Sequence, residues 1–185
     1  TWLEQNKLDE NHPLTPYLAD LAEPEYGTLT ADDGQVMHYR LFKPATVNDG
    51  KKHPVLVNVY GGPHAQRVTN SWRSKNLYFQ YMAQQGYVVF QLDNRGSYNR
   101  GKKFEDAIYK HLGVVEVADQ IKGVEFLRTL DYVDPQRIGI YGHSYGGYMA
   151  LMTMFKAGDY FNAGVSGAPV TDWALYDTHY TERYL

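Results

Sequence analysis

The stretch "RIGIYGHSYGGYM", residues 137–149, joins a short apolar run to a glycine-rich turn that carries one serine. An apolar run of this length is typical of a strand that is covered on both faces. The segment after the turn is apolar on most sides and ends at Gly158, which is typical of a buried helix. Gly142 and Gly146 flank Ser144 at the positions where side chains would collide with neighbouring backbone. The stretch therefore predicts a strand, a sharp turn that exposes Ser144, and a helix.

Short apolar runs alternate with helical patterns along most of the chain. The apolar runs lie at 54–60, 87–93, 137–143 and 162–169, and the helical patterns lie at 74–86, 114–130 and 145–158. The pattern at 114–130 places one apolar stripe on a helix: Val117, Ile121, Val124, Leu127 and Leu130. This alternation predicts an α/β fold in which a mostly parallel sheet carries helices on both faces. Before it, the turn Asp32-Asp33-Gly34 between two strand-like runs predicts a hairpin.

The composition excludes several classes of protein. With 185 residues, of which 43% are hydrophobic, the chain can bury the core of one domain or of one piece of a larger domain. A net charge of -3 favours neither nucleic acid nor a charged membrane surface as a partner. Because cysteine is absent, disulfides, thiolate catalysis and Cys-based zinc sites are excluded. We expect no cofactor and no metal, and no apolar run is long enough to span a membrane.

A second candidate site lies in "VNVYGGPHAQ", residues 57–66, where Tyr60 ends a predicted strand and two glycines open a loop. In an α/β-hydrolase sheet, the loop after this strand faces the nucleophile and supplies half of the oxyanion hole. The Tyr60 hydroxyl and the backbone N–H of Tyr145 are therefore the candidate oxyanion donors. The alternatives are that Tyr60 is an ordinary strand-end aromatic residue and that Ser144 only caps the following helix.

Four motifs together resemble the peptidase domain of the prolyl oligopeptidase superfamily, most closely its dipeptidyl peptidase IV branch of bacterial type. They are "VYGGPHAQ", "LDNRGS", "GHSYGGYM" and "APVTDWALYDTHYTERY". The last is the most specific, because relatives with other specificities share the serine turn without this spacing of aromatic residues. The resemblance implies the N-terminal part of an α/β-hydrolase catalytic domain over residues 26–185, truncated before its last strands. It makes residues 1–25 an entry segment from a preceding β-propeller that this chain lacks.

The resemblance also implies roles for individual residues. Ser144 becomes the nucleophile, and Tyr60 and Tyr145 become the oxyanion donors. A compact pocket for the side chain before the cut bond, which family members fill with proline or alanine, would be lined by Tyr145, Val170, Trp173, Tyr176 and Tyr180. A rigid aromatic box suits a pyrrolidine ring, although the same residues can be plain core aromatics. Glu182 and Arg183 are expected to form an ion pair at the pocket wall.

The base of Ser144 is not evident in the sequence. In this fold the order along the chain is serine, acid, histidine, and the only histidine after Ser144 is His179. We reject the combination of Ser144, Asp172 and His179, because the family places its acid and histidine after two further strands. His64 precedes the serine and His143 projects away from the turn. We therefore expect the catalytic acid and histidine beyond Leu185 and no activity in this chain alone.

The main hypothesis is a serine exopeptidase that releases X-Pro or X-Ala dipeptides from peptide N-termini through an acyl-enzyme. The alternatives are an acylaminoacyl peptidase or oligopeptidase, an esterase, and a non-catalytic relative that acts as a binding module. Asp93 and Arg95 are interpreted as loop architecture. A peptide is the expected partner, and the resemblance implies a homodimer. The sequence does not decide between bacterial periplasm and cytoplasm, nor does it show what binds the substrate amine.

Overall fold

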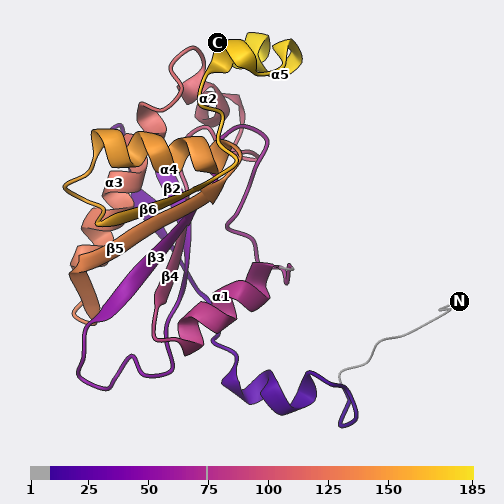
Figure 1. Cartoon of the computed structure of the whole chain (residues 1–185), viewed down its shortest axis with the longest axis vertical. Coiled ribbons are helices and arrows are strands. Elements are labelled where there is room, and N and C mark those ends of the chain that lie inside the picture. The colour runs from indigo at the N-terminus through magenta and orange to yellow at the C-terminus, as the bar shows by residue number, and fades with distance from the viewer. Residues whose placement is uncertain (1–8, 74) are drawn as a thin grey trace, which may run out of the picture.

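A six-stranded sheet forms the centre of the molecule (Figure 1). The computed structural model describes residues 9–73 and 75–185. The strands are β1 (Glu25–Thr30), β2 (Val36–Phe42), β3 (His53–Val59), β4 (Val88–Asp93), β5 (Val133–His143) and β6 (Ala163–Gly167). They lie in the order β1-β2-β4-β3-β5-β6. β1 to β2 and β2 to β4 are antiparallel, whereas β4, β3, β5 and β6 are mutually parallel. The predicted mostly parallel sheet is confirmed.

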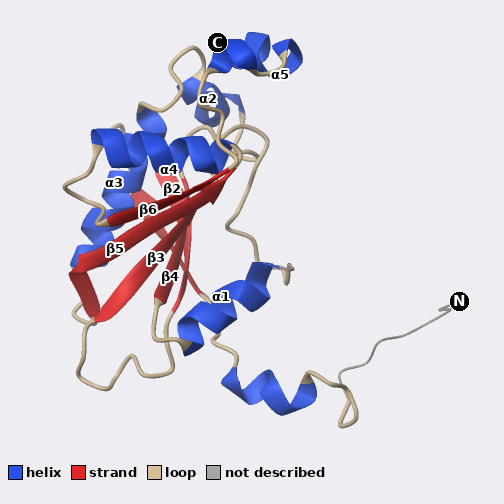
Figure 2. Cartoon of the chain, in the orientation of Figure 1, coloured by secondary structure: helices blue, strands red, loops and turns tan. Residues whose placement is uncertain are grey.

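The helices lie on both faces of the sheet (Figure 2). They are α1 (Lys75–Gln84), α2 (Lys102–Glu105), α3 (Val115–Arg128), α4 (Tyr145–Lys156) and α5 (Thr178–Tyr184). Short 3-10 helices occur at Thr15–Asp20, Asp106–Ile108 and Trp173–Leu175. α3 and α4 cover one face, α1 lies on the other, and α5 lies at the end toward which β5 and β6 run (Figure 1). The three predicted helices are confirmed, although β5 begins before the predicted residue 137.

The hairpin of β1 and β2 turns at the predicted residues. Gly34 has a φ of 83°, and its N–H donates to the Ala31 carbonyl at 2.9 Å. The Asp33 carboxylate accepts the N–H of Gln35 at 3.0 Å. The Asp-Gly pair favours a turn with positive φ, because glycine has no Cβ atom that would clash in that conformation. The hairpin is joined to the rest of the sheet through the pairing of β2 with β4.

The predicted apolar stripe of α3 faces the core. Val117, Val124 and Leu127 are buried, and Ile121 and Leu130 are partly buried against the same core. The same helix also buries polar side chains that the stripe did not predict: Glu116, Asp119 and Gln120. Buried polar groups are hydrogen-bonded in folded proteins, so these three residues mark contacts with specific partners.

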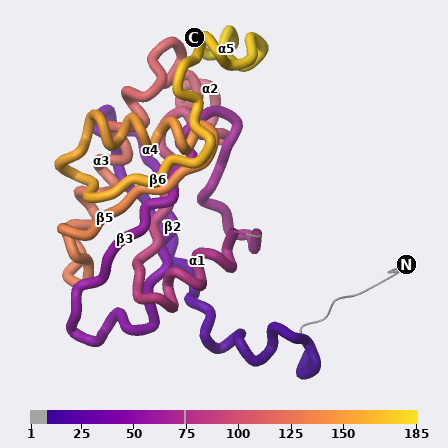
Figure 3. The backbone as a smooth tube through the Cα atoms, in the orientation of Figure 1, coloured from indigo at the N-terminus to yellow at the C-terminus, as the bar shows by residue number. Residues whose placement is uncertain are grey.

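The N-terminal segment packs against α1 (Figure 3). Ala22 donates its N–H to the Gln80 side chain at 2.6 Å, and its carbonyl accepts from the same amide at 2.8 Å. The predicted entry segment, residues 1–25, lies partly outside the described residues. Its origin in a preceding β-propeller stays a prediction. The truncation of the sheet before its last strands also stays a prediction. Among the helices of the described residues, none has the length and apolar character that crossing a membrane requires.

Candidate active site

Ser144 lies in the sharp turn between β5 and α4, with a φ of 61° and a ψ of -121°. Positive φ is uncommon for a residue with a side chain and stores backbone strain. The Ser144 N–H donates to the Gly167 carbonyl of β6 at 2.9 Å, which ties the turn to the neighbouring strand. The half-buried side chain therefore stands on a backbone that the sheet holds in place.

The glycines around Ser144 are required by close backbone contacts. A Cβ atom on Gly142 would stand 2.0 Å from the Gly146 carbonyl oxygen, and one on Gly146 would stand 2.4 Å from the Val59 oxygen. A Cβ atom on Gly147 would stand 2.5 Å from the Gly167 oxygen. Each distance is shorter than any real contact, so only glycine fits. A simple helix cap at Ser144 does not explain this packing, which favours the nucleophile turn.

Tyr60 stands beside Ser144, at the end of β3. Burial raises the pKa of Tyr60, whereas the nearby Arg67 guanidinium and the proximity of the Ser144 hydroxyl act in the opposite direction. The rings of Tyr60 and Tyr145 lie 6.0 Å apart between centroids. The Tyr145 ring packs directly against Gly62, where a Cβ atom would stand 2.4 Å from that ring. The structure thus brings Tyr60, Ser144 and Tyr145 together.

Tyr145 begins α4, and its side chain is only 2% exposed. Its backbone N–H belongs to the first turn of the helix, where N–H groups have no partner within the helix. That N–H follows Ser144 directly, at the position where a hydrolase of this fold stabilises an oxyanion. The Tyr145 hydroxyl donates to Glu116 Oε1 at 2.6 Å. The ring is therefore anchored away from the turn while the backbone N–H stays available.

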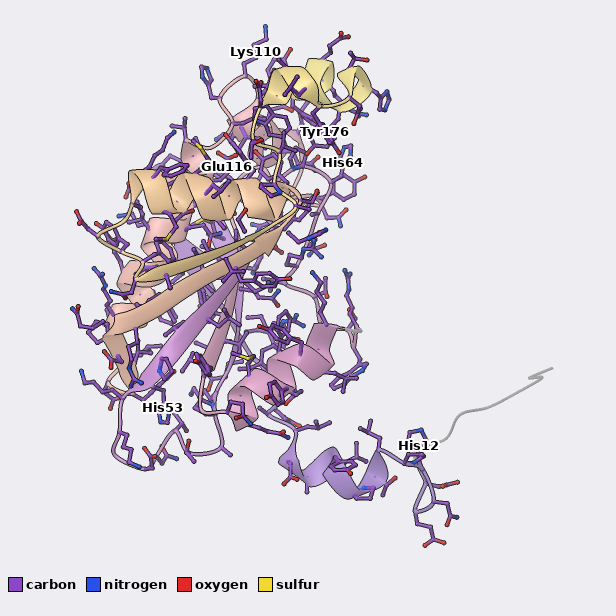
Figure 4. All side chains as sticks on the ribbon, viewed as in Figure 1. His12, His53, His64, Lys110, Glu116 and Tyr176 are labelled. Carbon is purple, nitrogen blue, oxygen red and sulfur yellow. The ribbon has the colours of Figure 1, made fainter. Side chains whose placement is uncertain are left out.

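Glu116 is a site residue that the sequence analysis missed. It is fully buried and lies beside α4 (Figure 4). Besides the Tyr145 hydroxyl, it accepts the N–H groups of Gly113 at 2.9 Å and Val114 at 3.1 Å. Burial raises the pKa of Glu116, and these hydrogen bonds oppose the increase. In the sequence, the only sign that Glu116 could have a specific partner was the place of its carboxylate next to the apolar stripe of α3.

We predict that Glu116→Ala lowers the free energy of unfolding by about 3 kcal/mol, because it leaves two buried donors, the Tyr145 hydroxyl and the Gly113 N–H, without an acceptor and removes the acceptor of the Val114 N–H. Glu116→Gln should cost less stability, since its amide oxygen still accepts a hydrogen bond.

The pKa of Glu116 is raised in the folded state. The contribution of Glu116 to stability is therefore full when the pH is below its pKa in the unfolded chain, and it declines as the pH rises through its pKa in the folded protein. Urea unfolding from pH 4 to 8 should therefore show a flatter profile for Glu116→Gln than for the unmodified protein; equal slopes would contradict this.

The aromatic wall lies next to this turn and consists of Tyr145, Tyr148, Trp173, Tyr176, Tyr180 and Tyr184. Trp173 stacks on Tyr180 with ring centroids 6.0 Å apart and an interplanar angle of 6°. Tyr176 meets Tyr180 edge to face at 5.5 Å, and Trp173 lies 5.8 Å from Tyr145. Such offset and edge-to-face pairs are the favoured geometries of aromatic rings. The wall is therefore a continuous aromatic surface that extends from α4 to α5.

Four of the five predicted pocket residues belong to this wall. Val170 is half-buried but is not part of the ring contacts that join the others. Tyr148 and Tyr184 were not predicted, and each joins the wall through a neighbour three or four residues away on its own helix. The Tyr180 hydroxyl is buried and has no hydrogen-bond partner among the described residues, and burial raises the pKa of Tyr180.

No histidine of this chain hydrogen-bonds to Ser144, and all of them lie within the described residues. His179 is exposed on α5, and Asp172 is exposed and accepts the N–H of Ala174 at 2.9 Å. His64 faces the Tyr184 hydroxyl, 3.1 Å from its Nε2, at the same end of the molecule as Tyr176 (Figure 4). The rejected combination of Ser144, Asp172 and His179 is therefore not assembled. Residues 9–73 and 75–185 also contain no cluster of His, Asp or Glu suited to a metal ion.

Asp93 and Arg95 hold loops, as interpreted from the sequence. Asp93 accepts the N–H groups of Arg67 at 2.8 Å and of Val68 at 2.9 Å. Arg95 pairs with Asp119 at 2.6 Å and with Asp33 at 2.8 Å, which links the β1–β2 turn to α3.

The expected ion pair between Glu182 and Arg183 is wrong. Both side chains are exposed, and neither belongs to the ion pairs that the described residues form. Exposed pairs contribute little to stability, so this wall is held by its rings instead.

Comparison with known proteins relates this arrangement to peptidases. Dipeptidyl peptidase 8 of Mus musculus and of Homo sapiens are each 42% identical over 180 residues, which cover 96% of this chain and 20% of theirs. A probable dipeptidyl peptidase 4 of Aspergillus flavus is 35% identical over 182 residues, 96% of this chain and 24% of its own. The chain therefore spans about a fifth to a quarter of the length of these relatives.

A solved structure supports the same relation. The crystal structure of a protein described as a dipeptidyl aminopeptidase IV from Bacteroides ovatus superposes with a TM-score of 0.86 and 49% sequence identity, over 91% of this chain and 24% of that one. This likeness confirms the α/β-hydrolase fold. Residues 72–185, which are more than half of the chain and contain Ser144 and all of the aromatic wall, match the prolyl oligopeptidase family. The chain belongs to the prolyl oligopeptidase family of serine peptidases.

Proposed function

We propose that the protein of which this chain is a part is a dipeptidyl peptidase that releases X-Pro or X-Ala dipeptides from peptide N-termini. The observation that carries the proposal is the position of Ser144, on a strained turn between the Tyr60 hydroxyl and the backbone N–H of Tyr145. The names of the relatives, dipeptidyl peptidases 8 and 4, support the substrate class.

The proposed reaction proceeds through an acyl-enzyme. Ser144 Oγ attacks the carbonyl carbon of the second residue, and a base takes the hydroxyl proton. The negative charge on the carbonyl oxygen is stabilised by the Tyr60 hydroxyl and the Tyr145 N–H. The C–N bond then breaks and the leaving amine receives the proton. Water attacks the ester in the same way, the Ser144–acyl bond breaks, and the dipeptide leaves. Because no histidine of residues 1–185 bonds to Ser144, the base is proposed to come from elsewhere in the enzyme.

The aromatic wall is proposed to select the side chain before the cut bond. The stacked rings of Trp173 and Tyr180 present a flat, rigid surface. Tyr176, which is 41% exposed, forms the outer edge of this surface. A pyrrolidine ring or a methyl group can be buried against such a surface without a polar partner, whereas a charged side chain cannot. This supports proline or alanine at the second position of the substrate.

Labelling and substrate comparison on the whole enzyme test the proposal. A fluorophosphonate should label Ser144, and a Gly-Pro chromogenic amide should be hydrolysed faster than an N-acylated amide. Ser71→Ala, which changes an exposed serine, should keep both activities. Preference for the N-acylated substrate would indicate an acylaminoacyl peptidase, hydrolysis of esters alone would indicate an esterase, and absence of labelling would indicate a binding module. Each of these results would overturn the proposal.

Residues 1–185 expressed alone are predicted to show no hydrolysis of a Gly-Pro amide above the rate of the Ser144→Ala variant. A serine hydroxyl without a base is a weak nucleophile at neutral pH. Turnover by the isolated chain that disappears in Ser144→Ala would show that the base lies within these residues.

We also propose that the whole enzyme is a homodimer, and its mass in solution tests this. The compartment stays open between periplasm and cytoplasm.

A further inference from the structure

Arg67 stands over the ring of Tyr60. Its guanidinium carbon lies 4.6 Å from the centroid of that ring. The residue follows Tyr60 on the loop after β3 and is half-buried. A guanidinium over an aromatic face is attracted by the ring quadrupole, and the attraction grows when the cation is partly desolvated. A fixed cation thus contacts the side chain that is proposed to donate to the oxyanion.

The sheet holds this loop in place. The Asp93 carboxylate, at the end of β4, accepts the N–H of Arg67 on one oxygen and the N–H of Val68 on the other. Asp93 is 5% exposed and Val68 is 8% exposed, so both are enclosed. A buried carboxylate that accepts two successive backbone N–H groups fixes the path of the chain at that point. The position of Arg67 is therefore built by the fold.

The charge of Arg67 has no ion-pair partner among the described residues. It lines a cavity of about 150 Å³ together with three other cations, Arg40, Arg73 and Lys75. Burial and the nearby Arg73 lower the pKa of Arg67, whereas Tyr60 and Asp93 act in the opposite direction. A partly desolvated cation without a paired carboxylate needs a compensating contact. The ring face of Tyr60 provides it.

We propose that Arg67 is a positioning residue for peptide hydrolysis, which clamps the Tyr60 ring and stabilises the negative charge that develops beside the Tyr60 hydroxyl. The inference rests on the proposed function. Because that charge exists only in the tetrahedral intermediate and the transition states around it, the effect falls on kcat and leaves KM unchanged. Arg67 also lowers the pKa of Tyr60 against the effect of burial, which makes the hydroxyl a stronger donor.

A double-mutant cycle in the whole enzyme tests this role. Tyr60→Phe should lower kcat by about 10²-fold to 10³-fold, the loss typical of one oxyanion donor. Arg67→Met, which keeps an unbranched apolar stem and removes the charged guanidinium, should lower kcat by about tenfold with KM unchanged, a transition-state effect. In the Tyr60→Phe background, Arg67→Met should have no further effect on kcat, because the hydroxyl through which it acts is gone.

Two variants serve as controls. Arg67→Lys keeps the charge and should recover most of the loss. Arg73→Met removes a neighbouring cation that does not stand over the ring, and it should leave kcat unchanged. If Arg67→Met lowers the melting temperature by more than a few degrees, Arg67→Gln replaces it in the same cycle.

The outcomes separate the two proposals. If the Arg67 and Tyr60 losses multiply in the double variant, or if the Arg67 loss falls on KM, the positioning role is overturned while the proposed function stands. If the unmodified enzyme is neither labelled at Ser144 nor active on the Gly-Pro amide, the proposed function fails and the role of Arg67 fails with it. An absent effect in the Tyr60→Phe background, together with recovery by Arg67→Lys, supports the proposal.

Discussion

Replacing Ser144 with alanine is expected to lower kcat of the whole enzyme on a Gly-Pro amide by about 10⁶-fold, as the loss of a serine nucleophile does elsewhere. In the proposed reaction the hydroxyl forms the covalent bond to the substrate, so no neighbouring group replaces it. The proposed donors Tyr60 and Tyr145 remain, and they would account for any residual rate above that of water. Steady-state kinetics with active-site titration of the unmodified enzyme measure the loss. A loss of less than about 10²-fold would point to a different nucleophile.

Ser144→Gly separates the chemical role of this residue from its backbone strain. Glycine should be as inactive as alanine, but it adopts the φ of 61° without the steric cost that a Cβ atom carries. We expect Ser144→Gly to be more stable than Ser144→Ala by about 1 to 2 kcal/mol in denaturant unfolding. Equal stability of the two variants would show that the turn is not strained.

The second large effect is expected from Gly142→Ala. A Cβ atom at this position would stand 2.0 Å from the carbonyl oxygen of Gly146. Both groups are backbone atoms that the turn holds, so neither can move as a flexible side chain does. We expect a loss of about 3 kcal/mol or more in the free energy of unfolding, at or beyond the upper end of overpacking effects. Fluorophosphonate labelling of Ser144 should also be lost.

Gly139→Ala is the matched control for this change. Gly139 lies on the same strand, β5, and a Cβ atom there would meet its nearest neighbour, the Ala163 oxygen, at 3.6 Å. This is ordinary van der Waals contact, so we expect a change within about 1 kcal/mol and full labelling of Ser144. If the two alanine variants are equally stable, the close packing of Gly142 against Gly146 does not hold the turn.

The turn at Ser144 could be predicted from the sequence because its causes are local. The glycines, the strand before them and the helix after them are adjacent in the chain, and each one favours the same backbone geometry. The spacing of Trp173, Tyr176 and Tyr180 was informative for a related reason. A single short segment, residues 173–180, carries these three rings, so their mutual contacts depend little on the rest of the fold.

The contacts that the sequence did not reveal join distant elements. Arg67 reaches the Tyr60 ring only because Asp93, on another strand, fixes the loop between them. Glu116 reaches Tyr145 only because α3 packs against α4. Residue identity predicts the capacity for such contacts, but the path of the loops decides which ones form.

The strand order has a consequence for how the chain folds. β4 lies between β2 and β3, both of which precede it in the sequence, and the pairing of β2 with β4 joins His38 to Asp93. The first hairpin and β3 therefore cannot enter one sheet until residue 93 has been synthesised. Pairings over such separations are slow, because the loop must close before the contact is gained. The β1–β2 hairpin can form from local pairing alone, but it joins β3 in one sheet only through β4.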